Sequence, residues 1–171
     1  MSTLELKELS HPSGEVIKIA AGKTLDLKSQ GNVTMPTGSV LQVVVGEDSS
    51  SLTIATSTYT DTGLSATITP TSTSSKILCM WGLQGEFNAA DVGVGTQLVR
   101  GSTNIYTSGT LYDIYSLAAG YRFRAEWKHL DSPSSTSSLV YKVQAATYAA
   151  RSVVFTQNNN KNQLVLMEIQ G

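Results

Sequence analysis

Residues 15–45, EVIKIAAGKTLDLKSQGNVTMPTGSVLQVVV, carry the pattern that decides the expected fold. Two apolar residues separated by one other residue recur about every eight positions. Residues two apart point to the same face of a β-strand, so each pair predicts one short strand with a single apolar face. The pairs are Ile17/Ile19, Leu25/Leu27, Val33/Met35 and Leu41/Val43.

These units are too short for one chain to enclose a core, because a single-chain solenoid coil needs ~20 residues or more. Three copies wound about a common axis could bury these apolar faces, since their inward-facing pairs would meet as a triangular prism. We therefore expect a homotrimer whose stalk interface consists of the four apolar pairs. Residues 1–45 would form the arm and stalk, and residues 46–171 a knob. The alternative is an ordinary β-meander that lies against the following domain.

The first residues contain a second apolar pattern, in which Leu4, Leu6 and Leu9 alternate with charged residues. This pattern fits a first strand or one turn of helix, and the residues His11 to Gly14 end it. A terminal segment this short is ordered only when it docks on something. We expect these leucines to attach the protein to a partner.

The composition excludes several classes of function. The chain has 171 residues, which is room for one domain and a short arm. Its 12 basic and 13 acidic residues give a net charge of -1, so no broad electrostatic footprint for nucleic acid or anionic lipid exists. Charged residues make up 15% of the chain, against ~25% in an average soluble domain, and Ser and Thr are abundant. Such a hydroxyl-rich surface suits a long-lived extracellular particle.

The single cysteine and the N-terminus bear on the compartment. Cys79 lies in the apolar run 76–81 and is expected to be a small buried hydrophobe, with no partner for an intrachain disulfide. The N-terminus lacks the pattern of a secretory signal, and no apolar run is long enough to span a bilayer. We expect the protein to be made in the cytoplasm and either kept there or released by lysis.

Residues 46–171 predict an all-β domain, because strand-sized segments alternate with turn residues. In residues 121–127, Tyr121, Phe123, Ala125 and Trp127 share one face and the charged residues between them share the other, as in a strand with one face in the core. The window 110–119 is ambiguous between helix and loop. The many short strands together predict a two-sheet sandwich of jelly-roll type. The expected strands are 52–58, 64–69, 76–82, 93–100, 104–107, 121–128, 138–147, 153–156 and 163–169.

No catalytic, metal-binding or cofactor-binding residues are predicted. His11, His129 and Cys79 show no metal-ligand spacing. His129 and Asp131 could serve a nucleophilic serine, but the sequence holds no Gly-x-Ser-x-Gly motif. Carboxylates that could cleave glycosides fall in loops or on solvent faces. These are Asp61, Glu86, Asp91, Asp113 and Glu126.

The segment 105–121 is rich in tyrosine, with Tyr106, Tyr112, Tyr115 and Tyr121 as its members. Exposed aromatic rings on a β-sandwich can bind sugars by stacking on their C–H faces. The same tyrosines can instead fill the core or a subunit interface with their hydroxyls at the rim. Both interpretations stay open at this point.

Several stretches are similar to virion proteins of tailed bacteriophages, especially phages of aquatic bacteria, which are described as structural or tail-fibre-like. The resemblance is carried by residues 19–26 (IAAGKTLD), 38–44 (GSVLQVV), 56–70 (TSTYTDTGLSATITP), 74–78 (SSKIL) and 97–102 (QLVRGS), together with the opening MSTL. It implies a homotrimeric knob on a β-rich stalk, without catalytic residues.

The resemblance also implies a place on the particle. With only about 45 residues ahead of the knob, the stalk is short for a distal tail fibre. A capsid decoration or cement protein on the outer surface is therefore expected, attached through Leu4, Leu6 and Leu9 to the major capsid protein or another virion protein. The alternative is a short tail fibre or adaptor that binds host-surface carbohydrate through Tyr106, Tyr112 and Tyr115.

Overall fold

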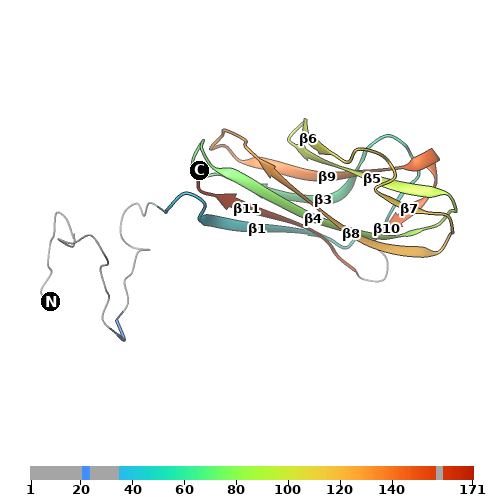
Figure 1. Ribbon diagram of the computed structural model, residues 1–171, viewed down its shortest axis with the longest axis horizontal. Helices are drawn as coiled ribbons and strands as arrows, with labels where there is room; N and C mark the ends of the chain where they lie inside the picture. Colours follow the sequence, from blue (N-terminus) through green and yellow to red (C-terminus); the bar gives the residue numbers. More distant parts are fainter. Residues whose placement is uncertain (1–20, 24–34, 157–159) are drawn as a thin grey trace, which may run out of the picture. The chain divides into compact units, whose positions relative to one another are not determined.

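In the part of the chain that the structure describes, eleven β-strands form two antiparallel sheets that pack face to face (Figure 1). The computed structural model describes residues 21–23, 35–156 and 160–171, and all of these strands lie in the unit that begins at Met35. Sheet A contains β1 (Val40–Asp48), β2 (Leu52–Ile54), β4 (Lys76–Phe87), β8 (Tyr121–Asp131), β10 (Val153–Phe155) and β11 (Asn162–Ile169). Sheet B contains β3 (Thr60–Ile68), β5 (Val92–Arg100), β6 (Thr103–Thr107), β7 (Ile114–Ser116) and β9 (Leu139–Thr147).

The strand order is that of a jelly roll. In sheet A, β8 pairs with one whole edge of β4, while β11 and β10 share the other edge, and β1 lies outside β11. In sheet B the order is β3-β9-β5-β6. Without the three-residue strands β2, β7 and β10, the remaining strands counted along the chain are ordered 1-8-3-6 and 2-7-4-5. The predicted two-sheet sandwich is therefore confirmed.

All nine expected strands are present, and the differences lie at their ends. Strand β7 was not predicted, because three residues are too few to show a period of two. The ambiguous window 110–119 contains this strand and no helix. Within the described residues the one helical element is the 3-10 turn Tyr148–Ala150, and no helix is long and apolar enough to cross a membrane.

Strand β1 crosses the boundary expected after residue 45. It pairs with β11 so that Val43 lies opposite Met167 and Val45 opposite Val165. Leu41 and Val43 therefore belong to the sandwich, because the partner for their strand is β11 of the same chain. The other residues expected in the stalk or the attachment segment fall outside the described residues, except Met35, which is 41% exposed. They are Leu4, Leu6, Leu9, Ile17, Ile19, Leu25, Leu27 and Val33.

Trp81 of β4 links the two sheets at the centre of the core. Its ring stacks with Trp127 of β8 at 6.3 Å between centroids and meets Tyr106 of β6 edge-on at 5.3 Å. The indole Nε1–H donates a 3.1 Å hydrogen bond to Oγ1 of Thr96 on β5. A buried tryptophan contributes a large apolar area, and its N–H needs a partner when it leaves water. This residue therefore fixes the distance and orientation of the sheets.

A buried ion pair joins the sheets at one end. Asp131 closes β8, and its Oδ2 accepts a 2.6 Å hydrogen bond from Nη1 of Arg100 on β5 and a 2.7 Å hydrogen bond from the hydroxyl of Tyr141 on β9. Cys79 lies in the neighbouring core and is fully buried, as the sequence predicted. Burial, with a smaller effect of the Asp131 charge, raises the pKa of the Cys79 thiol to about 12.

A second buried carboxylate, Glu168 of β11, ties β1 to the loop between β3 and β4. Its Oε2 accepts a 2.6 Å hydrogen bond from Gln42, and its Oε1 accepts three hydrogen bonds of 2.7 Å from Ser75 and from the hydroxyl and backbone N–H of Thr71. Burial alone raises the pKa of this carboxyl, but these hydrogen bonds outweigh it and hold the pKa below its usual value.

The stability of the sandwich is therefore expected to depend on Glu168 and on pH. The folded chain has the lower pKa, so the stabilisation is complete above the ordinary value of 4.5 and is lost as the pH falls through the folded-state pKa. Glu168→Gln should lower the free energy of unfolding at neutral pH by about 1–3 kcal/mol, and the difference should shrink in acid. Urea denaturation at neutral and acidic pH measures this. Glu126→Gln, at an exposed carboxylate whose ion pair with Arg124 is 3.9 Å long, is the control, and a pH-independent difference for Glu168→Gln would contradict the assignment.

The Cys79 thiol should be unreactive in the folded protein. A protonated and fully buried sulfur is a poor nucleophile, because the thiolate is the reactive form. We expect no labelling by a maleimide at neutral pH in buffer and one label per chain in denaturant, measured by mass spectrometry. Rapid labelling of the folded chain would show that β4 opens readily.

Candidate functional site

The outward-facing side chains of sheet A divide into an apolar half and a polar half. The register aligns apolar residues across four strands, so that Val43, Met167, Leu78 and Leu130 form one row. We call the whole set the apolar half. It consists of Val40, Val43 and Val45 of β1, Leu78 and Met80 of β4, Leu130 of β8, and Val165, Met167 and Ile169 of β11.

The apolar half is open to solvent. Val40, Val43, Val45 and Leu130 are 49, 51, 52 and 50% exposed, and the other members are half-buried. Its nine outward positions, on strands about 4.8 Å apart and at about 6.7 Å along each strand, cover roughly 290 Å². A contiguous apolar patch of this size on a soluble domain commonly marks a contact surface.

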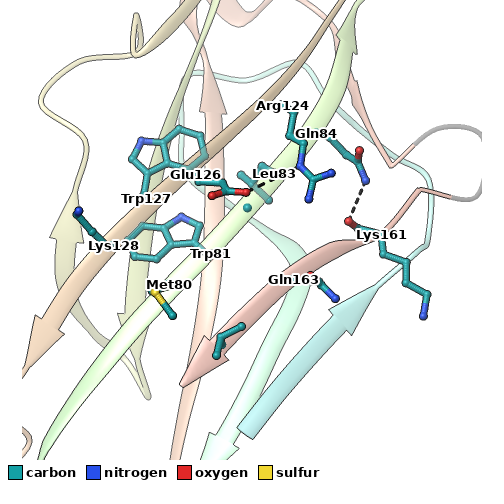
Figure 2. Close-up of a pocket in the computed structure, with 12 residues that line it drawn as sticks. Met80, Trp81, Leu83, Gln84, Arg124, Glu126, Trp127, Lys128, Lys161 and Gln163 are labelled. Carbon is teal, nitrogen blue, oxygen red and sulfur yellow. Dashed lines mark hydrogen bonds and ion pairs between the residues drawn. The ribbon is translucent and has the colours of Figure 1, made fainter. Parts of the chain in front are cut away.

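The polar half contains a groove with a volume of about 460 Å³ across β8, β4 and β11 (Figure 2). It passes over Gly82, which lies between Glu126 of β8 and Gln163 of β11 and leaves space because it has no side chain. Figure 2 shows the Gln84 amide directed at the backbone of Lys161, to which it donates a 2.8 Å hydrogen bond. The groove is lined by Met80, Trp81, Gly82, Leu83, Gln84, Arg124, Glu126, Trp127, Lys128, Lys161, Gln163 and Val165.

Most charges of the polar half are paired. The ion pairs are Arg122–Glu86 at 2.7 Å, Arg124–Glu126 at 3.9 Å and Lys161–Glu47 at 2.5 Å. Exposed pairs of this kind contribute little to folding, but they give the surface a fixed pattern of donors and acceptors. Protein–protein interfaces usually combine an apolar patch, like the apolar half, with neighbouring polar groups, like those of the polar half. The outer face of sheet A is therefore suited to binding protein.

A second surface feature is a cluster of three tyrosines, Tyr112, Tyr115 and Tyr148, which we call the tyrosine cluster. The ring centroids of Tyr112 lie 4.4 Å from Tyr148 and 5.7 Å from Tyr115, and Tyr115 lies 6.4 Å from Tyr148. Tyr112 and Tyr115 are 48% and 39% exposed. The nearby Tyr148 hydroxyl is the main reason that the pKa of Tyr112 is raised, so the Tyr112 hydroxyl stays protonated at neutral pH.

Two glycines allow the loop that carries Tyr112 to lie directly on β5. A Cβ atom at Gly93 would overlap with the carbonyl oxygen of Leu111, and a Cβ at Gly95 would stand 2.8 Å from that of Thr110. Ser108 fixes the start of the loop, since its Oγ accepts a 2.9 Å hydrogen bond from the Thr96 N–H. The close approach of backbone to strand explains both glycines.

A carboxylate and a guanidinium border the tyrosine cluster. Asp91, in the turn between β4 and β5, has a φ of 57°, and its carboxylate accepts a hydrogen bond from the Tyr115 hydroxyl. Arg151 follows Tyr148 and forms an ion pair with Asp91 at 3.6 Å. The arginine also donates to the carbonyl of Ala90. Residues from three separate segments thus meet at one place on the surface.

The structure separates the tyrosines that the sequence grouped together. Tyr112 and Tyr115 are in contact, and Tyr148 joins them from a distant part of the chain. Tyr106 instead packs on Trp81 in the core and against the ring of His129 at 5.8 Å. Tyr121 is 61% exposed and begins β8.

The residues considered for catalysis are each engaged elsewhere. Asp131 is bound by Arg100 and Tyr141, and no hydrogen bond of the described residues joins His129 to a serine. No group of three His, Cys, Asp or Glu side chains in the described ranges could hold a metal ion. The five carboxylates have separate partners: Asp61 contacts Lys142 and Gln144, Glu86 contacts Arg122, Asp91 contacts Arg151, Asp113 contacts Trp127, and Glu126 contacts Arg124.

Sequence reasoning named Tyr112, Tyr115 and Val43 but not the residues that surround them on the two surfaces. The tyrosine cluster depends on Tyr148, Asp91 and Arg151, which are far from Tyr112 in the chain. The pair Gly93 and Gly95 in one strand was the available signal, since glycines inside a strand indicate that another backbone comes close.

Comparison with known proteins shows a shared fold. No protein-family model matches the chain, and no curated protein matches it. A structure of the Gx strain of infectious bursal disease virus matches with a TM-score of 0.52 and 12% identity, over 87% of this chain and 37% of that chain. The VP2 subviral particle of the same virus matches with a TM-score of 0.50, 12% identity and the same coverage. The chain therefore spans 37% of the length of these viral chains and shares with them the fold of that part.

Proposed function

We propose that this protein is a non-enzymatic structural protein of a tailed-bacteriophage virion, a homotrimer on the capsid exterior that acts as a decoration or cement protein. The observation that carries the proposal is the apolar half of sheet A, exposed on a jelly-roll sandwich. The fold shared with chains of virus particles supports it. The resemblance to phage virion proteins and the hydroxyl-rich composition support it further.

The proposed occupant of the apolar half is a second copy of this chain. Its patch of roughly 290 Å² is about a third of the ~800 Å² that each partner contributes to a standard interface, and the neighbouring polar half could supply the remainder. The outward β1 position Val43, which the sequence placed in the trimer interface, lies in this patch. Self-association here would bury residues that a monomer leaves in water.

A cement protein stabilises a shell by adding contacts across the joints between capsomers. Internal pressure must then break the added contacts as well as the shell. Three N-terminal segments on one trimer raise the effective concentration of each, so individually weak contacts could hold the trimer on the particle. In this proposal Leu4, Leu6 and Leu9 make the attachment to the major capsid protein or another virion protein.

The second candidate function is a short tail fibre or adaptor that binds carbohydrate on the host surface. One observation favours it, namely the exposed tyrosine cluster with its carboxylate and guanidinium. An image of the virion with this protein labelled separates the two candidates, because one lies on the capsid and the other on the tail.

Charge placed in the apolar half should break the assembly. The double variant Val43→Lys/Val45→Lys keeps the β1–β11 pairing, since both side chains point outward, but it would bury unpaired lysine charges in the proposed interface. The mass in solution, measured by light scattering, should fall from three times the 18.2 kDa chain towards one. Val140→Lys is the matched control, because Val140 is a 39% exposed valine on sheet B. A double variant that stays trimeric would contradict the assignment of this face.

Removal of residues 1–12 should separate assembly from attachment. The truncated protein should keep its trimeric mass but no longer co-sediment with particles that lack the native protein. Full-length protein added to the same particles is the control. If the truncated form still decorates them, the attachment surface lies in another part of the chain.

A further inference from the structure

Exposure of the tyrosine cluster to water is unfavourable unless a ligand covers the rings. Large rings at 48% and 39% exposure leave apolar area in water that burial would remove. The rings are nevertheless held in place, because the backbone before Tyr112 lies on β5 over Gly93 and Gly95, the Tyr112 ring packs on Tyr148, and Tyr115 is hydrogen-bonded to Asp91. A rigid and exposed aromatic platform is a favourable binding surface, since little side-chain entropy is lost when a ligand binds.

The polar groups beside the rings are also fixed. Asp91 supplies carboxylate oxygens that accept hydrogen bonds, and Arg151 supplies guanidinium N–H groups that donate them. The ion pair of 3.6 Å between the two holds them side by side. Two neighbouring hydroxyl groups of a cyclic ligand can form hydrogen bonds with an acceptor and a donor arranged in this way.

We propose that the tyrosine cluster, with Asp91 and Arg151, binds a neutral hexopyranose unit of a host-surface polysaccharide. One face of such a sugar presents C–H groups, which are slightly electropositive and match the electronegative face of a tyrosine ring. Its hydroxyl groups match the donor and acceptor beside the rings. This inference rests on the proposed virion function for the source of the sugar, while binding itself can be measured on the isolated protein.

The charges favour a neutral sugar over an acidic one. The guanidinium of Arg151 is already balanced by Asp91. Asp113, which belongs to the same loop region as Tyr112, adds a further negative charge and is bonded to the Trp127 indole at 3.1 Å. A uronate or sialate carboxylate would therefore meet no free cation among these residues and would be repelled.

The position of the cluster leaves it accessible in the proposed assembly. Ile114 of β7 packs against the core, so Tyr115 beside it points to the outer face of sheet B. The apolar half lies on sheet A, towards the start of β4, whereas Asp91 follows the far end of β4. Figure 1 shows β7 at the opposite end of the sandwich from the C-terminus and the start of β1. Contact with a second copy through sheet A thus leaves the tyrosines free.

The test is a titration of the full-length protein with maltose, cellobiose and lactose, followed by isothermal titration calorimetry and by saturation-transfer NMR. A glycan array with neutral, sialylated and uronate sugars extends the panel. We expect binding of at least one neutral sugar. Tyr112→Ala should weaken that binding by about tenfold or more, and Tyr112→Phe should weaken it less because the ring remains. Asp91→Asn should also weaken it while keeping the backbone, since asparagine tolerates a positive φ.

Tyr121→Ala is the matched control, because it removes an exposed tyrosine outside the cluster and should leave binding unchanged. Circular dichroism and solution mass confirm that each variant is folded and assembled. Absence of binding to every neutral sugar, a preference for acidic sugars, or full binding by folded Tyr112→Ala would each overturn the proposal. None of these results bears on the trimer or on its attachment to particles, so failure here is distinguishable from failure of the proposed function.

Discussion

The hydrogen-bonded pairing along both edges of β4 is the constraint on which the rest of the structure depends. Its twelve residues pair with β8 on one side and with β11 and β10 on the other, so one strand sets the register of sheet A. Because side chains alternate, that register places Trp81 in the core and Leu78 and Met80 on the outer face. A shift by one residue would exchange the two sets. The same pairing therefore decides the core and the proposed assembly surface.

The strands of the sandwich could be predicted from sequence because their information is local. Alternation such as that of Tyr121 to Trp127, bounded by turn residues, identifies a strand without knowledge of its neighbours. The same pattern does not say which partner covers a strand. Residues 40–45 continue the apolar rhythm of the preceding arm, yet their strand pairs with β11 at the other end of the chain. This explains why the expected boundary at residue 45 lies inside β1.

The surfaces required information that no local pattern contains. Tyr112 and Tyr148 are 4.4 Å apart between ring centroids but belong to separate segments joined only by the fold of sheet B. The apolar half likewise consists of outward-facing residues from four strands, and no single strand shows the patch in its own sequence. Such sites become visible once the register is known. The two surfaces lie on opposite sheets, and this separation would allow the proposed assembly and the proposed sugar binding to occur at the same time.

Strand β8 limits how neighbouring copies of the domain could associate. It lies at the edge of sheet A, and within the described residues no strand pairs with its second edge. Its outward positions carry Arg122, Arg124, Glu126 and Lys128. Closely spaced copies could otherwise join edge to edge into continuous sheets, and charged side chains on an exposed edge oppose that process. Closely spaced copies of this domain would therefore remain separate and would not join into fibres.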